Sequence, residues 1–131
     1  MSGTKKIYVC SALRGDVENN IEKAKAYCAF VVKEHGAIPV APHIYFTQFL
    51  DDSIPEEREF GMNAGLSLLS GCDELWYFGD SVSEGMRNEI CYAAEHGIPV
   101  RFVPSHYYES YLERRPAMKS QDKNQTFSRR S

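Results

Sequence analysis

A short aromatic run followed at once by a helical pattern limits what this chain can fold into. The run Glu74–Phe78 predicts a buried strand, and Gly79 follows it as a turn residue. Apolar residues then recur at helical spacing between Met86 and Ala93, so we expect a helix to begin between Ser81 and Ser83. Strand-to-helix turns of this kind lie at the carboxyl edge of an open α/β sheet, where ligands bind.

The same strand-then-helix order repeats along the chain. Strands are predicted at residues 5–11, 37–41, 74–78 and 98–103, and helices at 16–35, 53–70 and 81–96. Pro39 places the second strand at an edge of the sheet. The pattern predicts an α/β fold of three layers: a doubly wound parallel sheet of four to five strands, in the order 2-1-3-4.

Two serines are predicted to start helices. Ser53 is expected to be an N-cap, with Glu56 completing a capping box. Ser81 and Glu84 show the same spacing, so Glu84 is expected to serve the helix start and not the functional site.

Glu89 is the candidate catalytic residue. It flanks the apolar stripe of its helix, and Gly85 lies four residues earlier on the same face. Helical side chains lean toward the helix N-terminus, so the carboxylate is expected to lie over the bare Gly85 backbone, facing the sheet edge. Two interpretations are open: a reactive carboxylate suited to covalent catalysis at a sugar carbon, or a solvated helix residue.

Other polar side chains follow predicted strands and are candidate ligands. Arg14 and Gly15 form the turn after the first strand, where a guanidinium can grip phosphate, carboxylate or hydroxyl groups; the alternative for Arg14 is a surface ion pair. His43 opens a long connection, residues 42–55, that is expected to act as a lid, although a structural role for this histidine is also open. Asp80 either binds sugar hydroxyls or forms a turn.

Length, composition and charge limit the domain organisation, the partners and the location that we expect for this chain. The 131 residues and 43% hydrophobic content predict one domain, residues 1–112, followed by a polar and disordered tail, residues 113–131. A net charge of −3 gives no basic field for polymeric nucleic acid, and no apolar run is long enough to span a membrane. No signal sequence opens the chain, and no CxxC pair occurs among the four cysteines. We therefore expect a cytoplasmic location, reduced thiols and no metal site.

Three stretches, taken in order, carry a family resemblance. They are Ile-Tyr-Val-Cys-Ser-Ala-Leu-Arg-Gly at residues 7–15, Cys-Asp-Glu-Leu-Trp at 72–76, and Ser-Glu-Gly-Met-Arg-Asn-Glu-Ile-Cys-Tyr-Ala at 83–93. Together they resemble the nucleoside 2-deoxyribosyltransferase-like superfamily. It includes the nucleoside deoxyribosyltransferases and the deoxynucleoside 5′-monophosphate N-glycosidases. The resemblance covers residues 5–103 and implies a flavodoxin- or Rossmann-like sheet.

The resemblance implies a function and a set of site residues. In that family the glutamate at the position of Glu89 attacks C1′ of deoxyribose, and water or a second base resolves the resulting ester. The implied ligand is therefore a nucleoside or nucleotide, with no cofactor, bound to a homodimer or homotetramer that is completed by C-terminal residues. The implied substrate-binding residues, taken with those above, are Tyr8, Ser11, Arg14, Gly15, His43, Asp80, Ser83 and Gly85.

Two departures from the family pattern keep a second function open. Ala12 stands where phosphate-binding members carry serine. No aspartate occurs near Gly65, where members use one to assist the leaving base; Asn63 or His43 could substitute for it. The alternative is a binding module that holds a nucleotide-derived ligand, such as an ADP-ribose-like molecule, without turnover. A flavodoxin-type redox protein is disfavoured because no Ser/Thr/Gly-rich phosphate loop follows the first strand.

Overall fold

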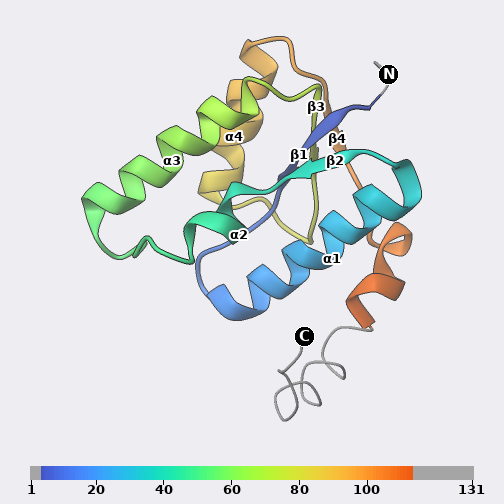
Figure 1. Cartoon of the computed structure of the whole chain (residues 1–131), viewed down its shortest axis with the longest axis horizontal. Helices are drawn as coiled ribbons and strands as arrows, with labels where there is room; N and C mark the ends of the chain where they lie inside the picture. The colour runs from blue at the N-terminus through green and yellow to red at the C-terminus, as the bar shows by residue number, and fades with distance from the viewer. Residues whose placement is uncertain (1–3, 114–131) are drawn as a thin grey trace.

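The fold is a parallel sheet with helices on both faces (Figure 1). The structure, a computed structural model, describes residues 4–113; the predicted tail, apart from Glu113, lies outside the described residues. The elements in chain order are β1 (Lys6–Cys10), α1 (Val17–His35), β2 (Ile38–Val40), α2 (Pro42–Phe46), α3 (Pro55–Leu69), β3 (Glu74–Tyr77), α4 (Glu84–Glu95), β4 (Val100–Phe102) and the 3-10 helix η1 (Ser105–Tyr107).

The strand order within residues 4–113 is β2-β1-β3-β4, and all three pairings are parallel. Tyr8 of β1 is in register with Val40 of β2 on one side and with Leu75 of β3 on the other. The predicted α/β class, the order 2-1-3-4 and the edge position of the proline-containing strand are confirmed. The sheet has four strands in the described part of the chain.

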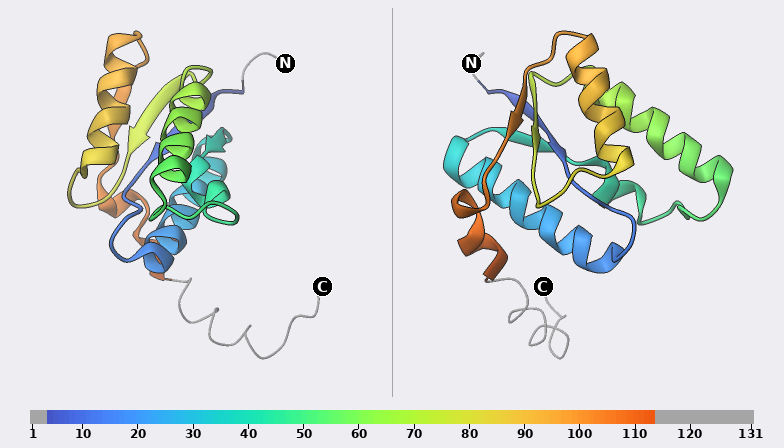
Figure 2. Two further views of the ribbon diagram at one scale, coloured as in Figure 1. Left: turned by 90° about the vertical axis from the view of Figure 1, so that its left-hand side faces the viewer. Right: turned by 180° about the vertical axis from the view of Figure 1, so that it is seen from behind.

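Side chains alternate between two core clusters, one on each face of the sheet, as the period of two in a strand requires. On one face, α1 contributes Tyr27, Phe30 and Val31, which pack with Ile7, Val9, Trp76 and Phe78. On the other face, α3 and α4 contribute Leu69, Met86 and Ala93, which pack with Tyr8, Cys10 and Leu75. Figure 2 shows these three layers from the side and from behind.

Helix α1 forms where its pattern predicts. The Asp16 carboxylate accepts a hydrogen bond from the backbone N–H of Asn19 at 3.4 Å, which is an N-cap contact. Gly36 ends the helix with φ of 61°, a left-handed conformation that glycine adopts at little cost.

The predicted capping boxes are both wrong. Helix α3 begins at Pro55 with Ile54 as N-cap, because proline fits the first helical position, where no N–H is needed; Ser53 instead donates its hydroxyl to Asp51 Oδ1 at 2.7 Å. Helix α4 has Ser83 as its N-cap, and the Ser83 hydroxyl accepts from the Met86 N–H at 3.2 Å. Glu84 is thus the first helical residue of α4.

Three further features of residues 4–113 bear on the expected function. Cys10, Cys28, Cys72 and Cys91 are free thiols. In this part of the chain, no group of three or more His, Cys, Asp or Glu side chains is placed to hold a metal ion. Among the described helices, none combines the length and the apolar character that crossing a membrane requires.

Candidate active site

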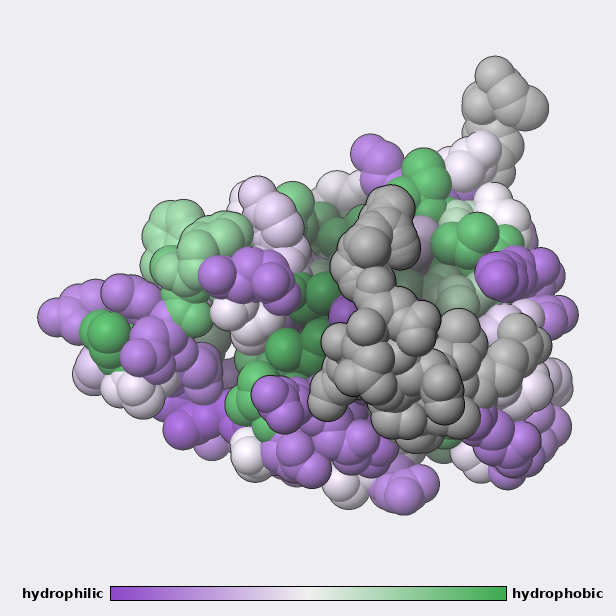
Figure 3. All heavy atoms as spheres, turned by 60° about the horizontal axis from the view of Figure 1, so that its bottom comes forward, coloured by the Kyte–Doolittle hydropathy of each residue, from purple (hydrophilic) through white to green (hydrophobic). Residues whose placement is uncertain are grey.

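A cavity of about 270 Å³ opens beside the carboxyl end of β1 and the N-terminus of α4. Its walls come from β1 and the turn after it, from α2 and the connection that follows, and from the facing sides of α3 and α4. Figure 3 views the molecule from the side toward which the strands' carboxyl ends point, where hydrophobic residues lie between hydrophilic ones around a hollow. Seven of the nine predicted site residues line the cavity: Tyr8, Ser11, Arg14, His43, Ser83, Gly85 and Glu89.

The other two predicted site residues, Gly15 and Asp80, do not line the cavity. Gly15 has φ of 100° and makes the bend between β1 and α1, so its contribution is to the backbone. Asp80 is exposed in the loop between β3 and α4, as the turn interpretation expects.

The carboxylate of Glu89 is held by a hydrogen bond from a residue of the sheet. The Tyr8 hydroxyl donates a hydrogen bond to Glu89 Oε2 at 2.8 Å, and the Tyr8 side chain is buried in β1 with 1% exposure. Tyr8 therefore belongs to the core and also reaches the cavity. Glu89 is neither in bulk solvent nor covered by packing, since its side chain is partly buried and lines the cavity.

Burial dominates the electrostatics of this pair. It raises the pKa of Glu89 above its ordinary value, while hydrogen bonds from Tyr8 and Cys10 lower that pKa in part. Burial, followed by the charge of Glu89, raises the pKa of Tyr8, so Tyr8 keeps its proton and remains a donor. The Glu89 carboxylate is thus weakly solvated and held by hydrogen bonds, an environment in which a carboxylate can act as a nucleophile.

Gly65 of α3 makes room for this pair. A Cβ at residue 65 would lie 3.2 Å from the Tyr8 hydroxyl and 3.9 Å from Glu89 Oε2. Gly61, one turn earlier on the same helix, lines the cavity as well. A Cβ at Gly85 would meet no atom within 4 Å, so the expectation that the Glu89 carboxylate lies over Gly85 is wrong. The hydrogen bond from Tyr8 holds the carboxylate beside Gly65 of α3 instead.

Ser11 and His43 form a second polar pair on the wall. Ser11 Oγ lies 3.0 Å from His43 Nε2, and the tautomer decides which atom donates. Burial lowers the pKa of His43 to about 4, so the imidazole is neutral near pH 7. Of the two substitutes considered for the absent aspartate, His43 lines the cavity and Asn63 does not.

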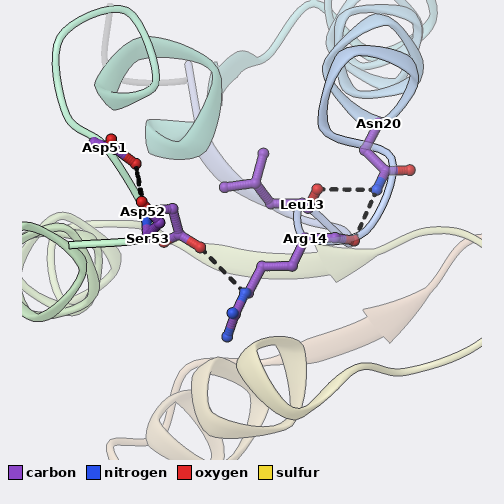
Figure 4. A network of polar contacts seen from close by, with 6 residues as sticks. All are labelled: Leu13, Arg14, Asn20, Asp51, Asp52 and Ser53. Atoms are coloured by element: carbon purple, nitrogen blue, oxygen red, sulfur yellow. Dashed lines mark hydrogen bonds and ion pairs between the residues drawn. The ribbon is translucent and has the colours of Figure 1, made fainter. Parts of the chain in front are cut away.

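Arg14 both faces the cavity and forms an ion pair. Its Nε lies 3.2 Å from Asp52 Oδ2, and Figure 4 shows the guanidinium reaching from the turn after β1 to the connection between α2 and α3. Asn20 Nδ2 fixes that turn by donating to the Leu13 carbonyl at 3.0 Å and to the Arg14 carbonyl at 3.2 Å. The ion-pair interpretation of Arg14 is confirmed, and its side chain also lines the cavity; the binding of a ligand by Arg14 stays a prediction.

Several cavity residues were missed by the sequence reasoning. Asp52, Glu57 and Arg58 come from the long connection and the first turn of α3, where the sequence carries no periodic signal. Glu84 was expected to serve the helix start and not the site, but it lines the cavity together with Asn88; their spacing of four residues could have placed both on one face.

The fold and this cavity define an α/β protein with a carboxylate-bearing site at the carboxyl edge of a parallel sheet. Residues 5–103 match the model of a protein family described as "Domain of unknown function (DUF7768)", and the chain belongs to that family. None of the curated proteins matches the chain.

A solved structure supports the fold. It is a 2-deoxyribosyltransferase from the psychrotolerant bacterium Bacillus psychrosaccharolyticus, which is similar with a TM-score of 0.56 and 19% sequence identity. The similarity covers 74% of this chain and 70% of that chain. At this level of identity it shows a distant relationship of fold, in agreement with the resemblance in the sequence.

Proposed function

We propose that the protein is an N-glycosidase or deoxyribosyltransferase that cleaves the N-glycosidic bond of a nucleoside or nucleotide through a covalent glutamyl-sugar intermediate. The observation that supports this most is the Glu89 carboxylate, held by Tyr8 at 2.8 Å on the wall of an open cavity. The cavity volume of about 270 Å³ is close to the lower end of small-molecule sites, roughly 300 Å³, and suits one small ligand.

In the proposed reaction, a carboxylate oxygen of Glu89 forms a bond to C1′ of the sugar as the bond from C1′ to the base breaks. The electron pair of the broken bond passes to the base nitrogen, and the base takes up a proton from solvent water; the water or second base that attacks later returns a proton to the solvent. Water or a second base then attacks C1′, which frees the carboxylate and gives a free sugar or a new nucleoside. The hydrogen bond from Tyr8 positions the carboxylate and favours its ionised form before the ester forms and after the ester is cleaved.

The base-side role falls to Ser11 and His43 in this proposal. Both face the cavity and lie 3.0 Å apart, so each fixes the hydrogen-bonding direction of the other. With a pKa lowered to about 4, His43 is neutral at working pH and acts as a hydrogen-bond partner of the leaving base. Ser83, whose hydroxyl caps α4, and Gly85 form the wall beside the sugar.

The test is the release of free base from deoxynucleosides and their 5′-monophosphates by the Glu89→Gln variant. We expect at least about a thousandfold loss of rate with the fold retained, because an amide cannot form the ester. Glu95→Gln is the matched control: it makes the same change on the same helix, at an exposed residue outside the cavity. Wild-type rates in the Glu89→Gln variant would contradict the nucleophile assignment.

A second candidate function is a binding module without turnover, for a nucleotide-derived ligand such as an ADP-ribose-like molecule. The absence of an aspartate beside Gly65 favours it. Ligand-dependent thermal stabilisation with no free base from any nucleoside or nucleotide would identify this function. The homodimer or homotetramer and the cytoplasmic location stay predictions.

A further inference from the structure

Carboxyl groups outnumber cationic groups around the cavity. The carboxyl side chains that line it are Asp52, Glu57, Glu84 and Glu89, whereas the guanidinium side chains are Arg14 and Arg58. Glu57 and Arg58 are neighbours on the first turn of α3, and their charges offset each other. Arg58 therefore does not reverse the excess of negative charge on the rest of the cavity wall. A doubly charged phosphate entering this cavity meets repulsion from fixed negative charges.

One edge of the Arg14 guanidinium is already paired with a carboxylate. Arg14 Nε lies 3.2 Å from Asp52 Oδ2, so a phosphate that approached this side-on edge to form two parallel hydrogen bonds would meet Asp52 there (Figure 4). A substrate phosphate would have to displace Asp52 from Arg14 to form that arrangement.

Asp52 is also held in position by its neighbours. Asp51 Oδ1 accepts from the backbone N–H of Ser53 at 2.9 Å, and the Asp51 N–H donates to Glu57 Oε1 at 2.6 Å. On the other side of the ion pair, Asn20 fixes the backbone of the Arg14 turn. Both partners therefore come from restrained backbone, which favours their pairing before a ligand enters.

The N-terminus of α4 is the second place where an anion could bind, and it carries its own negative charge. Glu84 is the first residue of the helix and lines the cavity, and the Ser83 hydroxyl is taken by the Met86 N–H. The carboxylate of Glu84 is thus near the partial positive charge that would otherwise attract a phosphate.

We infer that Asp52 is a specificity-determining residue that makes the site select deoxynucleosides, with an uncharged 5′-hydroxyl, over deoxynucleoside 5′-monophosphates. The inference rests on the proposed function and names the substrate class of the same site. A 5′-hydroxyl can donate to the Asp52 carboxylate, whereas a 5′-phosphate is repelled by it and loses access to the side-on face of Arg14.

The experiment compares Asp52→Asn with wild type. The substrates are 2′-deoxyadenosine, 2′-deoxyguanosine, 2′-deoxycytidine, thymidine and the four corresponding 5′-monophosphates, and the readout is kcat/KM for base release. Wild type is expected to prefer the nucleosides. Asp52→Asn is expected to raise the ratio of kcat/KM for a monophosphate to kcat/KM for its nucleoside by about tenfold or more. The reason is that a charged hydrogen bond becomes available to the phosphate. Adding Arg14→Gln to that variant should remove the gain.

Asp51→Asn is the matched control, because it removes the same charge from the adjacent residue, which does not line the cavity, and its amide oxygen can still accept from Ser53. Calorimetric binding of the same compounds in the Glu89→Gln background separates recognition from turnover. Three results would overturn the inference while base release still supports the proposed function. They are a preference of wild type for the monophosphates, an unchanged ratio of kcat/KM values in Asp52→Asn, and an equal change of that ratio in Asp51→Asn. Preferential nucleoside binding without base release from any substrate would overturn the function and leave the selection intact; binding of none of these compounds would overturn both.

Discussion

The inner and outer parts of the cavity are held by different kinds of contact. The inner part consists of Tyr8 with Glu89 and of Ser11 with His43, and its hydrogen bonds of 2.8 and 3.0 Å are partly buried. The outer part is the Arg14–Asp52 ion pair, whose side chains are 61% and 35% exposed. Burial strengthens an interaction and makes its loss costly, while exposure leaves a contact that a ligand can exchange. The inner part is thus suited to fixed chemistry and the outer part to choosing the substrate.

The largest expected effect is a pH dependence of the protein's stability that comes from His43, in the inner part of the cavity. Because the pKa of His43 falls to about 4 in the folded protein, the unfolded chain binds a proton first as pH drops below about 6.5. The free energy of unfolding therefore decreases as the pH falls from about 6.5 to about 4, by up to about 3 kcal/mol in total. Urea unfolding of wild type and His43→Asn at pH 7 and pH 4.5 measures the difference. His106→Asn, at an exposed position on η1, is the control, and equal pH dependence in wild type and His43→Asn would contradict the buried neutral imidazole.

The next effect concerns the bond that positions the nucleophile. Tyr8→Phe keeps the buried ring and removes the donor to Glu89, so base release should fall by about 10- to 100-fold, as the loss of a charged hydrogen bond predicts. Without this donor the pKa of Glu89 rises further, so the acid side of the pH–rate profile should move to higher pH. Tyr107→Phe, at an exposed residue, should change neither quantity. A rate loss without the shift of the pH profile would indicate a packing role for Tyr8.

The smallest effect is expected at the outer part. Asp52→Asn should change the free energy of unfolding by less than about 1 kcal/mol, because an ion pair this exposed contributes little to stability. Chemical denaturation at low and high salt measures it. A loss of unfolding free energy as large as the one that His43→Asn causes at pH 7 would contradict the contrast between the inner and outer parts of the cavity.

The fold was predictable because local patterns determine it. Alternating apolar runs and helical stripes gave the parallel sheet and its order, and Asp16 and Gly36 bounded α1 as expected. The capping residues were mispredicted, since Ile54 and Ser83 are the N-caps of α3 and α4 in place of Ser53 and Ser81. Short capping patterns do not settle which residue becomes the N-cap.

The candidate site was predictable residue by residue, and its contacts were not. Strand ends pointed to Arg14 and His43, the helix pattern to Glu89, and the family resemblance to Tyr8; the structure places all four around one cavity, and their roles stay proposals. The bond between Tyr8 and Glu89 joins residues 81 positions apart, and no local pattern reports such a contact. Gly65 shows the same limit, because no local pattern around it indicates that the Tyr8 hydroxyl would lie only 3.2 Å from a Cβ at this position.

The most direct test of the central claim is mass spectrometry of the intact protein and of its peptides after rapid acid quenching with a deoxynucleoside. We predict a deoxyribosyl adduct on the peptide that carries Glu89, and its absence from Glu89→Gln treated in the same way. Base release without an adduct on Glu89, or with the sugar attached to another residue, would contradict the account.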